Sequence, residues 1–278
     1  MQIIKREFAN VADYYRMATG ETDAPTRERS SRNGPANKWN GDAVFDDTCQ
    51  RYLRGYPELT AKAKALSVKL TPFLRTVKGM KRGFRPSMHA GGNFIIDNYN
   101  RGIPEACLTM QPVISKKFAS ILVNNTASAG IDADVLTMRG VAATALVDIL
   151  QANGYRVAVK LGYGILGGGY KLFDIITLKA FEQTMELDRL AFFLADPSAF
   201  RRLQFSAMET HPKIVRDSVG IRSSSGYGRP IELDSDYIGE KDIYLGCASF
   251  DQEHWHTLDT AQAWIKEALK RYGVQFYG

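Results

Sequence analysis

The feature that most constrains the fold is a strand pattern followed by a helix pattern, which begins at residue 118. Residues 118–123 form a short apolar run of the kind found in buried strands. A polar loop follows, and Asp132 then stands at a helix-capping position, ahead of an apolar stripe with helical spacing over 133–152. A buried strand that leads into a long helix predicts the first half of a strand-helix-strand unit.

The next two segments alternate between apolar and polar residues, as strands do. They cover residues 155–163 and 170–178, and the glycine-rich stretch 164–169 separates them. Glycine tolerates the positive φ angles of a tight turn, so we expect these strands to form an antiparallel hairpin. Because the run 118–123 is continuously apolar, we expect it in the centre of the sheet, with residues 170–179 at an edge.

Further helix and strand patterns complete an α/β arrangement. Helices are expected at 184–195 and 198–209, separated by Asp196-Pro197, and at 257–271, with a strand at 242–247. Strands that alternate with helices predict a mostly parallel, Rossmann-like sheet that is covered on both faces.

The first 116 residues have a different character. Residues 21–42 are rich in Pro, Gly, Ser, Asn and Arg and lack apolar periodicity, which predicts a mobile loop. Residues 43–70 carry a helical pattern that Gly55-Tyr56-Pro57 divides into two helices. We therefore expect a basic, mostly helical region over 1–116 and an α/β domain over 117–278.

The net charge of +6 is concentrated in the first region. Residues 1–116 hold 19 Lys and Arg against 11 Asp and Glu, whereas residues 117–278 hold 17 against 19. Such asymmetry is typical of a polyanion-binding surface, although moderately basic surfaces are also common without that role. Between residues 69 and 85 basic residues are interleaved with phenylalanines, a pattern that suits nucleic acid and single-stranded DNA in particular. The candidate contacts are Lys69, Arg75, Lys78, Lys81, Arg82, Phe84 and Arg85.

The loop after the first predicted strand carries a motif. Residues 121–128, ILVNNTAS, resemble the end of the first strand of von Willebrand factor A (VWA) domains, where the pattern is D-x-S-x-S. The resemblance covers residues 118–275 and rests on the motif together with the long helix and the glycine-turned hairpin. It implies a VWA-like sheet with an antiparallel edge strand and a divalent-cation site. The matching ligand positions are Asn124, Thr126 and Ser128.

The cation implied by this resemblance is Mg²⁺, which prefers oxygen ligands. Asn124 brings a neutral carbonyl where the family has an Asp, so one negative charge is missing from the site. We therefore expect the loop to bind Mg²⁺ weakly or not at all, and the protein to need no cofactor. Polar side chains that cap the following helix are the alternative interpretation of the same residues.

A second resemblance involves the helix after this loop. The run Arg139-Gly140-Val141-Ala142-Ala143, behind an N-x-T-x-S loop, is similar to an uncharacterised protein family of tailed bacteriophages. It implies a VWA-like phage protein that acts in the host cytoplasm as an accessory factor in viral transcription or replication. Its partners would be single-stranded DNA or another nucleic acid, and a phage RNA polymerase or a replication protein.

No group of residues has the spacing of a catalytic site, which favours a binding protein over an enzyme. The three cysteines are far apart and form no C-x-x-C pair. No stretch reaches the roughly 18 apolar residues of a membrane span, and the first residues lack a secretory pattern, so we expect a cytoplasmic protein without a membrane partner. Arg201 and Arg202 are either exposed residues of a predicted helix or a second contact for phosphate or an acidic partner.

Two functions are therefore compatible with the sequence. The first is a non-enzymatic nucleic-acid-binding accessory factor that recruits or assists phage transcription or replication machinery. The second is a VWA-type adaptor that binds another protein, with or without a metal ion, and is partnered with an ATPase.

Overall fold

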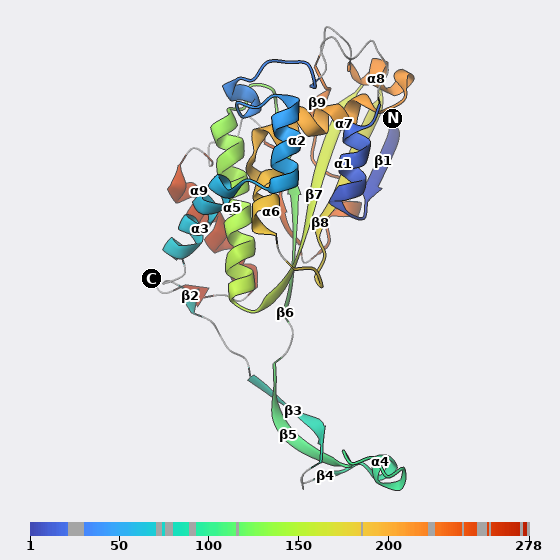
Figure 1. Ribbon diagram of the computed structural model, residues 1–278, viewed down its shortest axis with the longest axis vertical. Helices are drawn as coiled ribbons and strands as arrows, with labels where there is room; N and C mark the ends of the chain where they lie inside the picture. Colours follow the sequence, from blue (N-terminus) through green and yellow to red (C-terminus); the bar gives the residue numbers. More distant parts are fainter. Residues whose placement is uncertain are drawn as a thin grey trace. The chain divides into compact units, whose positions relative to one another are not determined.

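The computed structural model of the chain contains two compact units (Figure 1). The main unit comprises Met1–Arg75 and Phe118–Gly278, and the hairpin unit comprises Thr76–Lys117. The structure describes residues 1–21, 31–70, 74–75, 80–88, 93–114, 117–184, 186–221, 226–240, 242–248, 255, 257–272 and 275–276. None of the helices within these ranges is both long and apolar enough to cross a membrane.

The main unit is built on a mixed sheet with the strand order β1-β8-β7-β6-β10. The strands are β1 (Gln2–Phe8), β6 (Lys117–Asn124), β7 (Tyr155–Gly167), β8 (Tyr170–Lys179) and β10 (Asp242–Leu245). β1 runs parallel to β8 and β10 runs parallel to β6, whereas β7 is antiparallel to β8 and to the short β9 (Arg229–Pro230). The α/β class predicted from the sequence is confirmed.

β6 lies inside the sheet, and its second half is buried on both faces as the apolar run predicts, whereas Phe118 at its start is 50% exposed. Ile121 and Val123 belong to the largest core cluster, whereas the intervening Leu122 belongs to a separate cluster. All three side chains are at most 1% exposed. Because successive strand residues point to opposite faces, apolar residues are required at every position here.

β7 and β8 form the predicted antiparallel hairpin. Gly168 and Gly169 make its turn with φ angles of 51° and 85°. Residues other than glycine rarely adopt φ angles in this range. The prediction that β8 lies at the edge of the sheet is wrong, because β1 pairs with it from Gln2↔Tyr170 to Phe8↔Ile176. A strand at the start of the chain gives no local sign of which distant strand it joins.

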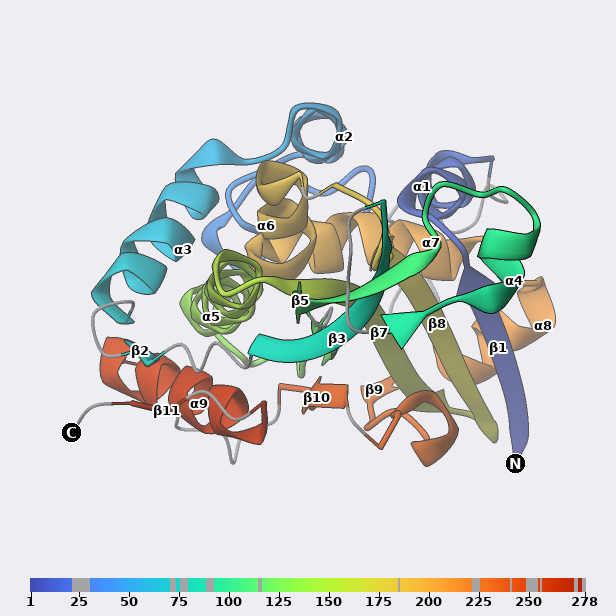
Figure 2. The same ribbon diagram turned by 90° about the horizontal axis from the view of Figure 1, so that it is seen from below.

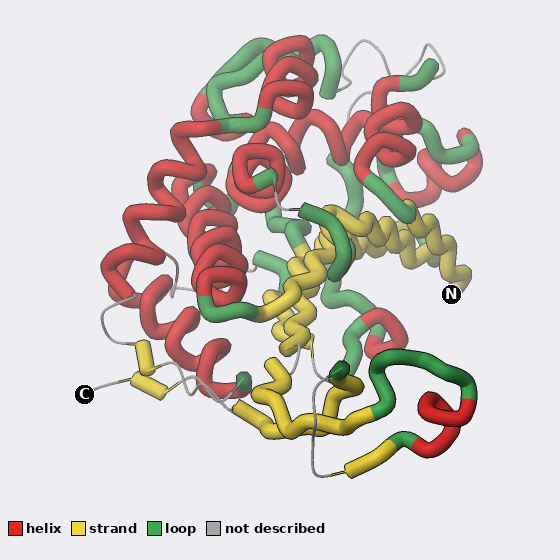
Figure 3. The backbone as a smooth tube through the Cα atoms, turned by 60° about the horizontal axis from the view of Figure 1, so that its bottom comes forward, coloured by secondary structure: helices red, strands yellow, loops and turns green. Residues whose placement is uncertain are grey.

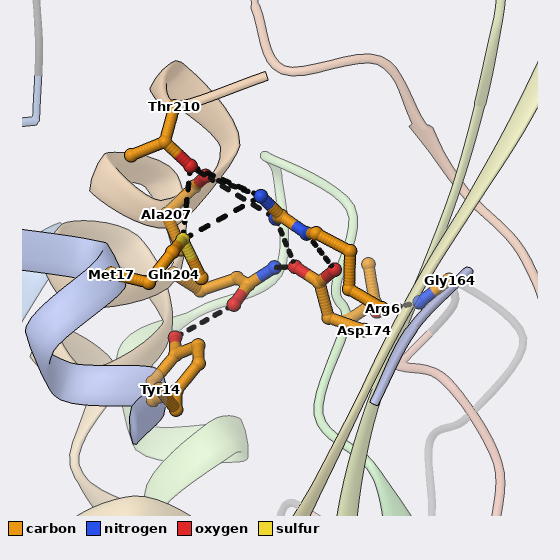
Figure 4. Close-up of polar contacts among 9 residues, drawn as sticks. Arg6, Tyr14, Met17, Gly164, Asp174, Gln204, Ala207 and Thr210 are labelled. Atoms are coloured by element: carbon orange, nitrogen blue, oxygen red, sulfur yellow. Dashed lines mark hydrogen bonds and ion pairs between the residues drawn. The ribbon is translucent and has the colours of Figure 1, made fainter. Parts of the chain in front are cut away.

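A buried ion pair holds β1 against β8 (Figure 4). Arg6 lies opposite Asp174 in the strand register, and its Nε and Nη2 each donate to one oxygen of that carboxylate at 2.6 Å. Gln204 donates to Asp174 at 2.8 Å and accepts from the Tyr14 hydroxyl at 2.7 Å. The guanidinium of Arg6 holds the pKa of the Asp174 carboxyl below its usual value, although burial of that group acts in the opposite direction.

Helices cover one face of the sheet (Figure 2). Among them, α5 makes its closest packing with α6, α3 and α9. At Gly140 of α5 the backbone of α6 is so near that an added Cβ would lie 1.9 Å from the Leu194 carbonyl oxygen. The helices are α1 (Val11–Thr19), α2 (Phe45–Arg54), α3 (Pro57–Leu70), α5 (Ala133–Ala152), α6 (Leu187–Ala195), the π-helical η4 (Ala199–Gln204), α7 (Phe205–Glu209), α8 (Lys213–Val219) and α9 (Leu258–Arg271).

The other face is covered largely without long helices. Leu233 packs there with Leu122, Phe173 and Ile175, and the side chains of Ile231 and Tyr237, among others, extend this cluster. Residues 231–240 provide much of this cover, and they contain one short 3-10 turn, η5 (Ser235–Tyr237). The sheet is thus covered on both faces as expected, but by different kinds of structure.

The hairpin unit consists mainly of paired strands. β3 (Met80–Ser87) and β5 (Cys107–Ile114) are antiparallel, and the two-residue β4 (Asn93–Phe94) pairs with the other side of β5. One short helix, α4 (Ile96–Asn100), follows β4. Figure 3 shows these strands in yellow and the helix in red.

These units differ from the division expected from the sequence. The contacts place residues 1–75 in the same unit as 118–278, whereas the expected division was 1–116 and 117–278. The helical pattern over 43–70 is confirmed as α2 and α3, but the segment 80–114 is mostly strand. Gly83 and Pro86 disfavour a helix within β3, which explains the difference. Of the predicted loop 21–42, residues 22–30 lie outside the described residues.

Candidate functional site

The positive charge of the protein is concentrated in the hairpin unit. Residues 76–117 contain seven Lys and Arg against two Asp and Glu, a net charge of +5 out of +6 for the whole chain. The main unit is therefore almost neutral. The difference in net charge per residue is more pronounced between the hairpin unit and the main unit than between the two halves of the chain that the sequence analysis compared.

The residues predicted to contact nucleic acid fall into both units. Lys69 is exposed in the last turn of α3, and Arg75 lies in the two-residue strand β2 (Leu74–Arg75), which pairs with β11 (Gln275–Phe276). Lys78 lies outside the described residues. The other four share the paired strand β3, and these are Lys81, Arg82, Phe84 and Arg85.

The hairpin unit also exposes apolar and aromatic side chains that the sequence analysis did not select. Phe94 is 55% exposed and Tyr99 is 65% exposed, with their ring centroids 5.3 Å apart. Met88, Ile96 and Ile103 are exposed as well. These residues lie in a Gly- and Asn-rich stretch without strand or helix periodicity, so their spacing in the sequence does not identify them as a group.

This unit has almost no interior in its described part. Side chains are described at 86–88, 94–108 and 117, and Ala106 is the one buried apolar side chain among them. Small sheets need an apolar face packed against something to be stable. Exposed apolar side chains that are gathered together commonly mark an interaction surface.

The predicted cation ligands lie in the loop at the carboxyl end of β6, and the side chains of Asn124 and Thr126 are engaged with the protein. The Asn124 amide donates to the Ile231 carbonyl at 3.0 Å and to the Tyr244 hydroxyl at 3.3 Å, and its oxygen accepts from the Thr126 N–H at 3.2 Å. The Thr126 hydroxyl accepts from the Gly164 N–H at 2.9 Å, and the Ser128 N–H donates to the Ala248 carbonyl. These bonds join the loop to β7, to the residue after β9, to β10 and to the chain after β10.

This arrangement does not fit a cation site. Asn124 and Thr126 are at most 1% exposed, and both use their side-chain oxygens as acceptors for backbone N–H groups. In the described part of the chain, no cluster of three or more His, Cys, Asp or Glu side chains has a geometry suited to a metal ion. The expectation that Mg²⁺ binds weakly or not at all stays a prediction, now with a geometric reason beside the missing charge.

Arg201 and Arg202 are buried, so the interpretation of exposed helical arginines is wrong. They are 1% and 3% exposed and lie in η4, in which every residue is buried. Arg201 donates to the carbonyls of Trp39 and Ile131, and Arg202 donates to those of Ser31, Pro35 and Ala43. Both side chains therefore hold backbone segments in place, and burial lowers the pKa of Arg201 to about 10.

Arg139 is a third buried arginine at this end of the sheet. It is 1% exposed and donates to the carbonyls of Asn124 and Gly246, while its Nε and Nη1 have no hydrogen-bond partner. Burial lowers its pKa to about 10, despite the attraction of Cys247 and Glu232. Together with the close packing at Gly140, this gives the Arg139-Gly140 pair of the helix motif a structural role.

The geometry thus defines an α/β protein with buried arginines around the carboxyl end of β6 and a separate basic hairpin unit. The chain belongs to a family described as a domain of unknown function, DUF7192, whose model matches residues 2–275. The matched range includes both units. No curated protein and no solved structure matches the chain.

Proposed function

We propose that the protein binds single-stranded nucleic acid through the hairpin unit, without catalysing a reaction. The observation that carries this proposal is the coincidence of a +5 charge with exposed Phe94 and Tyr99 in a unit that has one buried apolar side chain among its described positions. Basic side chains track phosphates, and exposed rings stack on bases, which is the combination used for single strands.

The accessory role in phage transcription or replication, with a phage polymerase or replication protein as partner, is the finer part of this proposal. It rests on the resemblance of the loop and helix motifs. A VWA-like main unit is proposed with it, supported by the order of β6, α5, β7 and the antiparallel β8 along the chain. The edge position of β1 departs from that family pattern.

The test is fluorescence anisotropy with a labelled single-stranded oligonucleotide across a salt series. Each phosphate contact to a single strand contributes about −0.7 to the slope of log K against log salt, so four or five contacts give a slope of about −3. The variant Lys78→Gln/Lys81→Gln/Arg82→Gln should flatten the slope by about 2. The variant Tyr99→Ala should weaken binding by roughly 1–3 kcal/mol and leave the slope unchanged.

A matched control removes the same charge from the main unit. Lys62, Lys64 and Lys160 are all exposed, and their triple replacement by Gln should leave the slope close to that of the unaltered protein. Equal effects of the two triple variants would show that binding follows total charge and would contradict a hairpin site. Absence of binding at about 50 mM salt would retire nucleic acid as the ligand and favour the protein-binding adaptor.

A further inference from the structure

A cavity of about 370 Å³ lies in the main unit beside the loop at the carboxyl end of β6. Its walls include Trp39, Ala129, Arg201, Arg202, Phe205 and Tyr227. Crevices outside the carboxyl ends of the strands are the usual ligand sites of open α/β sheets. This volume lies within the range of roughly 300–1,000 Å³ that is typical of small-molecule pockets.

One wall of the cavity carries two guanidinium groups that form no ion pair with the described residues. Arg201 and Arg202 donate to neutral backbone carbonyls, and within the described ranges no carboxylate lies at ion-pair distance from either guanidinium. Asp132 attracts Arg201 only from a greater distance. The Arg201 Nε is buried and has no hydrogen-bond partner. A bound anion would supply both the missing charge and an acceptor.

The rest of the lining is largely aromatic. The Arg201 guanidinium lies over the Trp39 ring at 4.2 Å from its centroid, and the rings of Phe205 and Tyr227 are stacked at 3.9 Å. Trp39 is 39% exposed, and its ring centroid lies 6.1 Å from that of Phe205. Flat aromatic surfaces beside a buried guanidinium favour a ligand with a planar ring over a simple inorganic anion.

We infer that this cavity binds a nucleoside monophosphate, with the phosphate toward Arg201 and Arg202 and the base against the aromatic wall. The site is separate from the hairpin unit and does not depend on the proposed nucleic-acid binding. Single-stranded DNA binding by the hairpin unit and mononucleotide binding by this cavity can each fail without the other.

Trp39 supplies the readout, because the ring lines the cavity. Titration of the full chain with adenosine 5′-monophosphate should quench tryptophan fluorescence in a saturable way, and Trp39→Phe should abolish that change. Inorganic phosphate and adenosine, each titrated alone, should bind at least tenfold more weakly. Arg201→Gln should weaken nucleotide binding at least tenfold, whereas Arg156→Gln, the same change at an exposed arginine outside the cavity lining, should not.

Arg201 also holds the Trp39 segment, so its variant is first checked for an unchanged circular dichroism spectrum. If it fails to fold, Ala129→Trp replaces it, because Ala129 is an exposed residue of the lining and a larger side chain there fills the cavity. Loss of nucleotide binding in the folded Ala129→Trp protein supports the inference. Absence of quenching overturns the inference, and so does phosphate or adenosine binding as tightly as the nucleotide. Nucleotide binding that is unchanged in folded Arg201→Gln, or in folded Ala129→Trp where that variant replaces it, also overturns the inference.

Discussion

Two groups of arginines in the main unit, Arg6 on β1 and Arg201 with Arg202 in η4, differ in what faces the guanidinium. Arg6 meets the carboxylate of Asp174 with two bonds of 2.6 Å, so the charge is paired within the protein. Arg201 and Arg202 donate to backbone carbonyls, and among the described residues neither guanidinium has a carboxylate at ion-pair distance. Breaking a buried pair leaves one charge without compensation, whereas a buried charge that has no partner would gain from a bound anion.

The largest effect is expected where the pairing is broken. Asp174→Asn leaves the Arg6 guanidinium, which is 19% exposed, without its counter-charge. Removing one partner of a buried ion pair costs about 3–5 kcal/mol, and urea unfolding should show a loss of that size. The double variant Arg6→Met/Asp174→Leu is the control and should recover much of it. A double variant that is no more stable than Asp174→Asn would contradict the assignment.

The pH dependence of stability should also differ between the two groups of arginines, because His211 and Asp174 lie near Arg6. Burial, followed by the nearby Arg6, lowers the pKa of His211 to about 4, so this side chain is neutral in the folded protein. The unfolded chain binds a proton near pH 6.5, so stability should fall by about 3 kcal/mol as the pH drops from 6.5 to 4. The lowered pKa of Asp174 adds a loss at still lower pH.

Urea unfolding across this pH range checks the acid prediction, with His211→Phe as the comparison. The variant should lose most of the slope between pH 6.5 and 4. Arg201, whose pKa of about 10 lies far above the range, should contribute nothing to it. The same slope in both proteins would assign the acid sensitivity to other groups.

A smaller loss is expected at the unpaired arginines. Arg202→Met removes three hydrogen bonds to carbonyls but also removes a buried charge, so the net cost should be about 1–3 kcal/mol, below that of Asp174→Asn. Hydrogen exchange should become faster within residues 31–43, which these bonds hold, and stay unchanged in β1. A cost above that of Asp174→Asn would reverse the comparison.

The smallest effect is expected at the surface. Lys38 and Asp134 form a 2.8 Å ion pair between the Trp39 segment and α5, with side chains 73% and 77% exposed. Solvent screens such a pair, so Asp134→Asn should leave the unfolding midpoint within experimental error. A clear loss of protein stability in Asp134→Asn would mean that the chain around Trp39 is held more by this ion pair than by Arg201 and Arg202.

Local patterns in the sequence predicted local structure well. The helix over 133–152 matches α5, and the break at Gly55-Tyr56-Pro57 separates α2 from α3. The burial of Ile121 and the pairing of β7 with β8 are also confirmed. Each of these depends on neighbours in the chain or on one apolar run, which is the information that periodicity carries.

What the sequence did not reveal depends on distant partners. β1 is placed at the edge by its pairing with the distant β8, where Arg6 meets Asp174. The burial of Arg201 and Arg202 depends on the packing of η4 against α1, α2, α6 and α7 and on carbonyls in residues 31–43. Charge and spacing alone suggest that an arginine is exposed. The concentration of charge in 76–117 was visible in the sequence, but its boundaries required the strand pairing of β3 and β5.

The attachment of β1 has a consequence for how the protein is made. The bond between Arg6 and Asp174 joins residues 168 positions apart, so β1 leaves the ribosome long before the strand it pairs with. Until β8 emerges, β1 carries unpaired backbone groups and a charged side chain without its partner. Completion of the sheet therefore waits for more than half of the chain, and truncation before residue 170 leaves the first strand with nothing to join.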